Sequence, residues 1–412
     1  MSTEEKNNLL IEYTAELDSQ MMTGKVNAAV LEKGLILKTI FDTAEIPYAE
    51  IQSLELKDYI LIVEADCGMF RFSKMGNWLE PFYNELYSAY NKKVRKALFV
   101  NGSPLMKVGG QYYLEEYGER VQGTAEIEIY EDCLLILPPN DGARRIPLCF
   151  VTSINKDDFK LSLQLDTEER YTFTMLGYDS EPFAETLMEQ LRLMREKTLL
   201  AVKEIDPLLT PQQAFTIAKK MPKGIAAPLG SLTALAPSFA DALEKKIQES
   251  RSAEEYIFFK SLCDPEKIWV GFHAFEEKES KDGEEGFHNE GILWLIVPGR
   301  NGNRAAVEFV VAEEESAATF IYRFEGGFDG FARRFNRALE AISFRREVIR
   351  LPEDTLQKPE YADYAMCIRR NAALQFVRGS FASRVIHASI GSWKKKIEKY
   401  LKEGKEDLSS SG

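Results

Sequence analysis

The sequence of 412 residues contains only three histidines, His273, His288 and His387. Histidine is the side chain that most often transfers protons near neutral pH, so this scarcity removes most routes to general acid–base catalysis. The chain also lacks the glycine-rich and Gly-x-Ser-x-Gly motifs that are typical of nucleotide-binding proteins and hydrolases. We therefore predict a protein that is not an enzyme and that uses no cofactor. If it were an enzyme, His273 and His288 would be the first residues to test.

Cysteine is scarce as well. The five cysteines are odd in number, widely scattered and never at Cys-x-x-Cys spacing, which favours free thiols in a reducing compartment over a disulfide framework. Cys263, His273 and His288 could approach one another if their strands pair. Their spacing matches no tight chelating pair, so we predict no metal site.

Long apolar runs are missing too. The longest candidate, residues 225–240, is interrupted by Pro228, Gly230 and Pro237, and is too short and too broken to cross a bilayer. The first residues are acidic and polar, whereas a secretory signal is basic and then apolar. These features predict a cytoplasmic protein with no transmembrane segment. The uncharged stretch 226–237 is either a docking loop for a partner or a linker packed on its own domains.

What the chain does contain is an internal repeat. Residues 70–98 recur 101 positions later, beginning with Tyr171, and a fixed period of this kind marks one folding unit per copy. In each copy, alternating strand-like segments end at a shared glycine and are followed by a helical stripe with apolar residues every three or four positions. The positions at which both copies carry the same residue type are Phe72, Gly76, Glu80, Pro81, Phe82, Leu86, Lys96 and Leu98.

This order of strands closed by one helix, with an Ile-Pro-Tyr/Leu-x-x-Ile/Val-x-Ser-Leu/Ile segment at residues 46–54 and 146–154, resembles the pleckstrin-homology-like domains, including their bacterial and GRAM-type relatives. The resemblance implies an α+β fold of tandem antiparallel β-barrels, each capped by a C-terminal helix. Members of this superfold differ in function, so the resemblance does not identify one.

The composition divides the rest of the chain. We predict pleckstrin-homology-like domains at residues 1–100 and 101–200, a helical linker at 201–254, and a β-rich domain with a C-terminal helix at 255–350. The ending of this third domain, Tyr322 to Phe328 and the following helix, looks like a degraded third copy. Residues 351–412 should form a basic helical segment with a disordered end, and the charged stretch 276–285 a solvated loop.

Charge is unevenly distributed. The net charge is −13, but residues 331–405 contain 17 Lys and Arg against 8 Asp and Glu, a local balance of +9. Guanidinium groups bind phosphates in paired fashion, so this region is a candidate surface for anionic lipid or nucleic acid. The alternative is a helix face that complements the acidic domains of the same molecule. The candidate binding residues are Arg333, Arg334, Arg337, Arg345 and Arg346.

Together these features predict an intracellular, non-catalytic scaffold or adaptor that binds another protein through tandem pleckstrin-homology-like domains. The alternative is peripheral binding to anionic membrane lipid or nucleic acid through the basic C-terminal third. A homo-oligomer is a further expectation, because the edge strands of incompletely closed barrels can pair with another chain.

Overall fold

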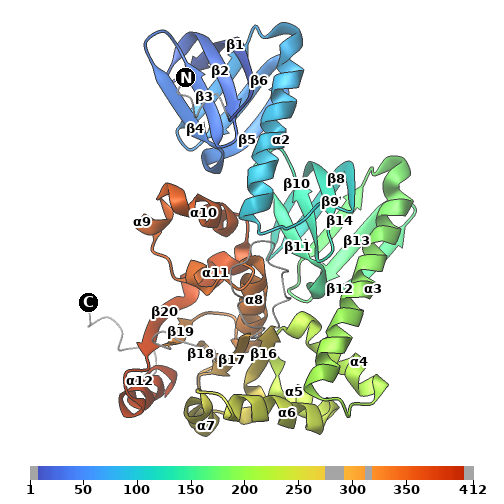
Figure 1. Cartoon of the computed structure of the whole chain (residues 1–412), viewed down its shortest axis with the longest axis vertical. Helices are drawn as coiled ribbons and strands as arrows, with labels where there is room; N and C mark the ends of the chain where they lie inside the picture. The colour runs from blue at the N-terminus through green and yellow to red at the C-terminus, as the bar shows by residue number, and fades with distance from the viewer. Residues whose placement is uncertain (1–7, 274–291, 311–317, 403–412) are drawn as a thin grey trace, which may run out of the picture. The chain divides into compact units, whose positions relative to one another are not determined.

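The computed structural model describes residues 8–273, 292–310 and 318–402. The predicted disordered end, the predicted charged loop and His288 lie outside these residues. The described residues form an α+β fold with three antiparallel sheets (Figure 1). The chain divides into two compact units: residues 1–147, 151–187 and 339–375 belong to the first, and residues 148–150, 188–338 and 376–412 to the second.

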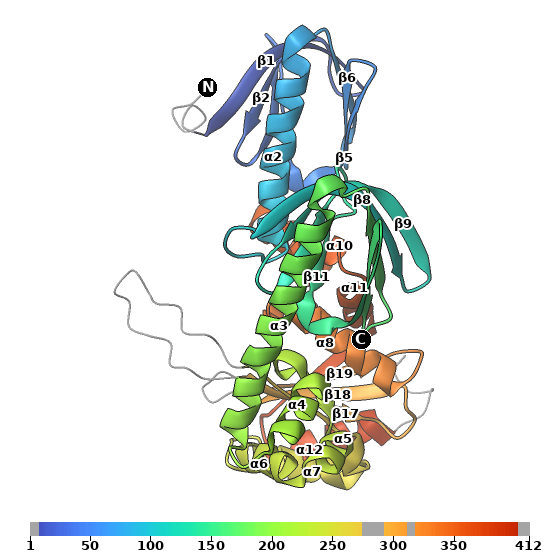
Figure 2. The ribbon, with the colours of Figure 1, turned by 90° about the vertical axis from the view of Figure 1, so that its right-hand side faces the viewer.

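The first unit contains a seven-stranded sheet with the order β4-β3-β2-β1-β7-β6-β5, followed by helix α2, Leu79–Ala97. We call these elements copy 1. Figures 1 and 2 show α2 running alongside the sheet. The strands are β1 Leu9–Ser19, β2 Thr23–Leu31, β3 Gly34–Lys38, β4 Thr43–Pro47, β5 Ile51–Lys57, β6 Ile60–Ala65 and β7 Gly68–Ser73.

Copy 2, in the same unit, has a second seven-stranded sheet with the matching order β11-β10-β9-β8-β14-β13-β12. It is followed by α3, Ser180–Ile205, whose first residues belong to this unit. Each strand of copy 2 therefore takes the place of its equivalent in copy 1. The strands are β8 Met106–Glu116, β9 Glu119–Ile129, β10 Cys133–Leu137, β11 Arg144–Pro147, β12 Val151–Asp157, β13 Lys160–Leu165 and β14 Arg170–Thr174.

The residues shared by the two copies occupy matching structural positions. Phe82 and Phe183 are fully buried, one near the start of each helix, and the Phe183 ring meets Phe173 of β14 edge-on. Gly76 and Gly177 both have φ near +60° (56° and 61°) at the turn before the helix, a conformation that favours glycine. The predicted apolar stripe of α2 is confirmed, because Phe82, Leu86, Tyr90 and Val94 join the core of copy 1. On α3, Phe183, Leu187 and Leu191 are buried, whereas Met194 is half-buried.

The second unit is built on a six-stranded antiparallel meander with the order β15-β16-β17-β18-β19-β20. Among the described residues this order does not repeat that of copies 1 and 2. Helices α4 Pro211–Lys220, α5 Leu229–Leu235, α6 Pro237–Gln248 and α7 Ala253–Leu262 precede most of the sheet. The strands are β15 Ala227–Pro228, β16 Trp269–His273, β17 Ile292–Pro298, β18 Arg304–Val310, β19 Ala318–Arg323 and β20 Phe381–Ile386.

The uncharged stretch 226–237 is part of the interior of the second unit. It forms β15 and α5, and Leu229, Leu232 and Ala236 are between 0% and 5% exposed within that core. Of the two sequence interpretations, the structure therefore supports the packed linker rather than a free docking loop.

The C-terminal region contributes residues to both units. Helix α8, Phe328–Ala341, is followed by α9 Glu353–Leu356, α10 Ala362–Arg369 and α11 Ala372–Ser380, and α12 Ile390–Lys402 follows β20. Residues 339–375 return to the first unit, where Met366 joins the core of copy 1. The sequence predicted only helix beyond residue 351, and the strand β20 corrects this prediction: it pairs antiparallel with β19 at the edge of the sheet, a long-range contact. No helix in the described part of the chain is long and apolar enough to span a membrane.

Candidate functional site

The five arginines proposed from the sequence are not gathered on one exposed helix face. Arg333, Arg334 and Arg337 lie on α8, but Arg345 and Arg346 follow its end and belong to the other unit. Arg337 is only 2% exposed, with its guanidinium 5.9 Å from the Phe150 ring. The two aromatic contacts at 4.4 Å, Arg334 over Phe376 and Arg345 over Phe99, show that these cations also pack against the protein itself.

The two described histidines occupy different environments. His273 ends β16, where burial and the nearby Lys223 lower its pKa to about 4, so the ring is neutral at physiological pH. His387, between β20 and α12, has a raised pKa. Burial alone would lower it, but the hydrogen bond that the ring donates to Glu308 and the charges of Glu308 and Glu255 outweigh burial.

His387 is the centre of a buried polar cluster. Its Nδ1 lies 3.1 Å from Glu255 Oε1 of α7, and its Nε2 lies 3.4 Å from Glu308 Oε2 of β18 and 3.0 Å from Thr319 Oγ1 of β19. Trp393 Nε1 of α12 donates to Thr319 Oγ1 at 2.7 Å. Glu308 and Thr319 are fully buried, so the hydroxyl cannot reach a substrate. The arrangement joins four elements and resembles no usable catalytic triad.

Other reactive chemistry is poorly supported in the described residues. Burial raises the pKa of the Cys133 thiol to about 12 and that of Cys263 to about 11, which keeps both protonated and weakly nucleophilic at neutral pH. No group of three His, Cys, Asp or Glu side chains is placed to hold a metal ion within the described ranges.

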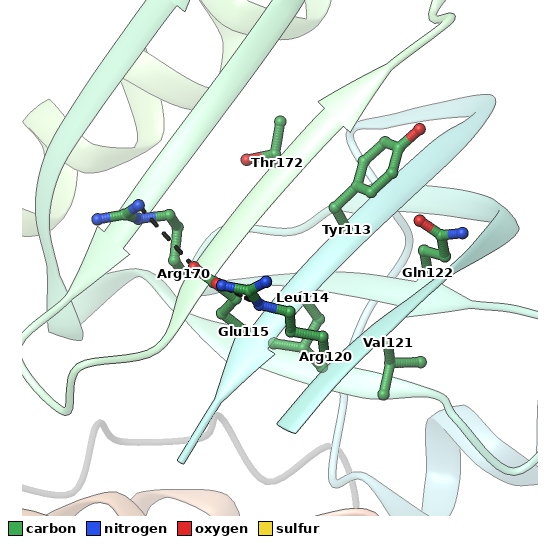
Figure 3. A pocket seen from close by; sticks show the side chains of 8 residues that line it. All are labelled: Tyr113, Leu114, Glu115, Arg120, Val121, Gln122, Arg170 and Thr172. Carbon is green, nitrogen blue, oxygen red and sulfur yellow. Dashed lines mark hydrogen bonds and ion pairs between the residues drawn. The ribbon is translucent and has the colours of Figure 1, made fainter. Parts of the chain in front are cut away.

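A hollow of about 370 Å³ lies on the outer face of copy 2 (Figure 3). Strand pairing explains its shape: Glu115 of β8 is opposite both Arg120 of β9 and Arg170 of β14, and Tyr113 is opposite both Gln122 and Thr172. Because side chains two residues apart share a face of a sheet, these six form two parallel rows across three strands. Leu114, between the rows on β8, points to the core and is 2% exposed.

The first row carries charge. Arg120 Nε lies 2.7 Å from Glu115 Oε1, and Arg170 NH1 lies 3.9 Å from Glu115 Oε2. The side chains of Arg120 and Arg170 remain 83% and 61% exposed, so one carboxylate is shared by two solvated guanidinium groups. The second row adds Tyr113, which is 43% exposed. In Figure 3, dashed lines join both arginines to Glu115, and the Tyr113 ring lies apart from them, nearer Gln122.

The first row of the hollow, with Glu115 and Arg120, lies on a part of the hairpin of copy 2 that copy 1 lacks. In copy 1 the first hairpin extends one residue pair, Asp18 with Thr23, beyond the pair Leu17–Gly24. In copy 2 the matching pair is Tyr112–Gly123, and four further pairs follow it. The sequence interpretation missed these residues. The alternation of polar and apolar residues at 111–116 was the available signal, but the pairing that brings Arg170 beside them is long-range.

Comparison with known proteins adds no assignment: the chain matches no protein-family model and no curated protein.

Proposed function

We propose that this protein is a non-catalytic scaffold or adaptor whose two repeated domains are pleckstrin-homology-like. The matching strand orders of copies 1 and 2 and the helix that follows each sheet support this reading of the fold. Because this superfold serves many functions, the argument for binding rests on the surface rather than on the fold.

The observation that carries the proposal is the lengthened first hairpin of copy 2. Two copies with the same strand order differ here, and the added pairs carry Glu115 and Arg120 of the charged row of the hollow. Exposed arginine and tyrosine are the residue types most enriched in protein interfaces. Arg120 and Arg170 contribute two positive charges around a single Glu115, so the face favours a partner segment with an acidic side chain.

The test is affinity capture with the full chain. Arg120→Glu combined with Arg170→Glu reverses the charge of the hollow without touching the core, and should reduce recovery of the partner by about tenfold or more. Arg71→Glu, on the exposed face of the equivalent strand of copy 1, is the matched control and should bind normally. Equal recovery with both variants would contradict this surface.

Binding to an anionic surface, lipid or nucleic acid, is the second candidate, and one observation favours it. Helix α12 buries Trp393, Ile397 and Leu401 and exposes Lys395, Lys396 and Lys399 on the opposite side. A solvated lysine face of this kind is attracted to phosphate. Flotation with vesicles with and without anionic lipid, and binding to single-stranded RNA, would show a strong decrease with salt if this candidate were correct.

A further inference from the structure

A loop of copy 2 already lies against the outer edge of copy 1. The loop joins β10 to β11 and comprises residues 138–143. The backbone NH of Leu54 on β5 donates to Pro139 O at 2.8 Å, and the NH of Asp141 donates to Gln52 O at 2.7 Å. Ser53 and Asn140 form a β-bridge between these bonds. The loop therefore extends the sheet of copy 1 by a short strand-like segment.

The equivalent edge of copy 2 has no such cover. Ile154 of β12 pairs with residue 163 as Leu54 pairs with residue 63, so the two are structural equivalents. In the described part of the chain, no backbone hydrogen bond joins the outer edge of β12 to another segment. Leu54 is 2% exposed beneath its loop, whereas Ile154 is partly exposed and Thr152 and Ser153 are exposed. We call the outer side of residues 152–154 the open edge.

Within the described ranges, the equivalent loop of copy 1 forms no backbone hydrogen bond with another segment. It joins β3 to β4 at residues 39–42, and we call it the apolar turn. The Thr39 hydroxyl accepts hydrogen bonds from the NH groups of Phe41 and Asp42 at 3.2 and 2.8 Å, which fixes the turn. Ile40 and Phe41 nevertheless are 92% and 90% exposed. A preorganised turn that displays two large apolar side chains loses little conformational entropy when it binds.

We propose that the apolar turn of one molecule docks on the open edge of a second copy of the chain. The contact between the β10–β11 loop and the edge of β5 supplies the template. The apolar turn is the equivalent of that loop, and the open edge is the equivalent of that strand edge, but the two do not contact each other within the described residues. The proposal is independent of the partner assigned to the hollow on copy 2. Since the turn and the edge are different surfaces, the contact is heterologous and builds a chain of molecules or a closed ring.

Both the loop and the helix beside the strand edge are more apolar in the proposed contact than in the internal one. The loop of copy 2 that docks on copy 1 is polar at Asn140, and tyrosine hydroxyls of α2 hold it and the end of β10: Tyr87 donates to Leu137 O at 2.5 Å and Tyr90 to Asn140 O at 3.0 Å. In the repeat, 101 residues later, these tyrosines are replaced by Met188 and Leu191. At these positions the repeat therefore carries no hydroxyl that could hold a polar loop as Tyr87 and Tyr90 do.

Cysteine crosslinking tests the geometry. In a Cys67→Ser background, which removes the exposed native thiol, Phe41→Cys and Ser153→Cys are made separately, at the positions equivalent to Asn140 and Ser53. A short bis-maleimide should crosslink the mixture of the two variants into dimers and should leave each variant alone monomeric on a denaturing gel. A crosslink of either single variant with itself, or none in the mixture, overturns the proposal.

Sedimentation of the full chain over a concentration series tests the energetics. The unmodified protein should show a concentration-dependent rise in mass, and Phe41→Asp should weaken association by about tenfold or more. Tyr59→Asp, another turn residue of copy 1 at 88% exposure, is the matched control and should associate like the parent. A mass that stays monomeric at all concentrations, or equal weakening by both variants, contradicts the proposal.

Discussion

The hydroxyl of Tyr90 on α2 donates a 3.0 Å hydrogen bond to the backbone oxygen of Asn140 in the β10–β11 loop. Arg370 NH2 in turn donates to the same tyrosine oxygen at 2.8 Å. Copy 1, copy 2 and the segment 339–375 therefore meet at one phenol within the first unit. Tyr90 and Arg370 are both at most 2% exposed, so each bond is made in a region without solvent competition.

Replacing Tyr90 by phenylalanine should destabilise the first unit by about 1–3 kcal/mol, because a buried donor and a buried acceptor lose their partner while the ring is kept. Urea denaturation measures the change. Tyr83→Phe is the control: Tyr83 lies on the same helix, is only partly buried and stacks on Tyr87, so removal of its hydroxyl should change stability by less than about 0.5 kcal/mol. Equal losses would show that the Tyr90 bonds contribute little.

The carboxylate of Glu128, on β9 of copy 2, is paired with Arg95 of copy 1. It is fully buried and accepts bonds from Arg95 of α2 at 2.8 and 2.9 Å, from Lys107 at 2.5 Å and from the Tyr130 hydroxyl at 2.8 Å. Glu128→Gln leaves Arg95 with a weaker acceptor and should lower the free energy of unfolding by about 3 kcal/mol. Glu115→Gln, at a solvated ion pair, should lower it by less than about 1 kcal/mol.

The same carboxylate predicts acid sensitivity. Burial alone would raise the pKa of Glu128, but the hydrogen bonds from Arg95 and Lys107 outweigh burial and lower the pKa to about 2. A depressed pKa stabilises the folded state above the unfolded value of about 4.3, and this stability is lost as pH falls towards 2. Unfolding curves between pH 5 and 2 should therefore fall less steeply for Glu128→Gln than for the parent. Parallel curves would be inconsistent with this assignment.

The two described histidines predict opposite pH responses in the second unit. The raised pKa of His387 means that its contribution is complete below about pH 6.5 and is lost as pH rises through the folded value. The lowered pKa of His273, about 4, means that its contribution is present above about pH 6.5 and is lost as pH falls towards 4. The protection of the α12 amides, measured as their exchange relative to the intrinsic rate at each pH, should therefore fall in the parent above neutral pH.

Two glutamine variants separate these effects. His387→Gln should remove the alkaline loss of amide protection in Ile390–Lys402, because Glu255 and Glu308 then face no titrating group at this position. His273→Gln should keep it and should instead flatten the loss of stability in acid. The interpretation of the His387 cluster would be wrong if the alkaline response survived in His387→Gln.

The sequence predicted the elements whose signals are local. The stripe of Phe82, Leu86, Tyr90 and Val94 is fully buried on α2, since a repeat of three or four residues places all four on one helix face. The repeat also predicted that copy 2 has matching strands and a matching helix. That these domains are pleckstrin-homology-like remains a proposal.

The candidate site could not be predicted in the same way. An arginine on α8 looks the same in sequence whether it faces solvent or, like Arg337, an aromatic ring of a distant segment. The His387 cluster draws Glu255, Glu308 and Thr319 from three separate elements, and no spacing in the sequence relates them. Likewise, Arg170 reaches the hollow on copy 2 only because β14 pairs with β8.

Because residues 339–375 belong to the first unit, that unit cannot complete its folding early in synthesis. Met366 and Arg370 complete the surroundings of α2, yet they are synthesised long after copy 1 and copy 2 have left the ribosome. The core of the first unit therefore stays incomplete until residues 339–375 have left the ribosome, after most of the second unit has been synthesised. A nascent chain stalled before residue 339 should consequently be more susceptible to protease within copy 1 than the finished protein.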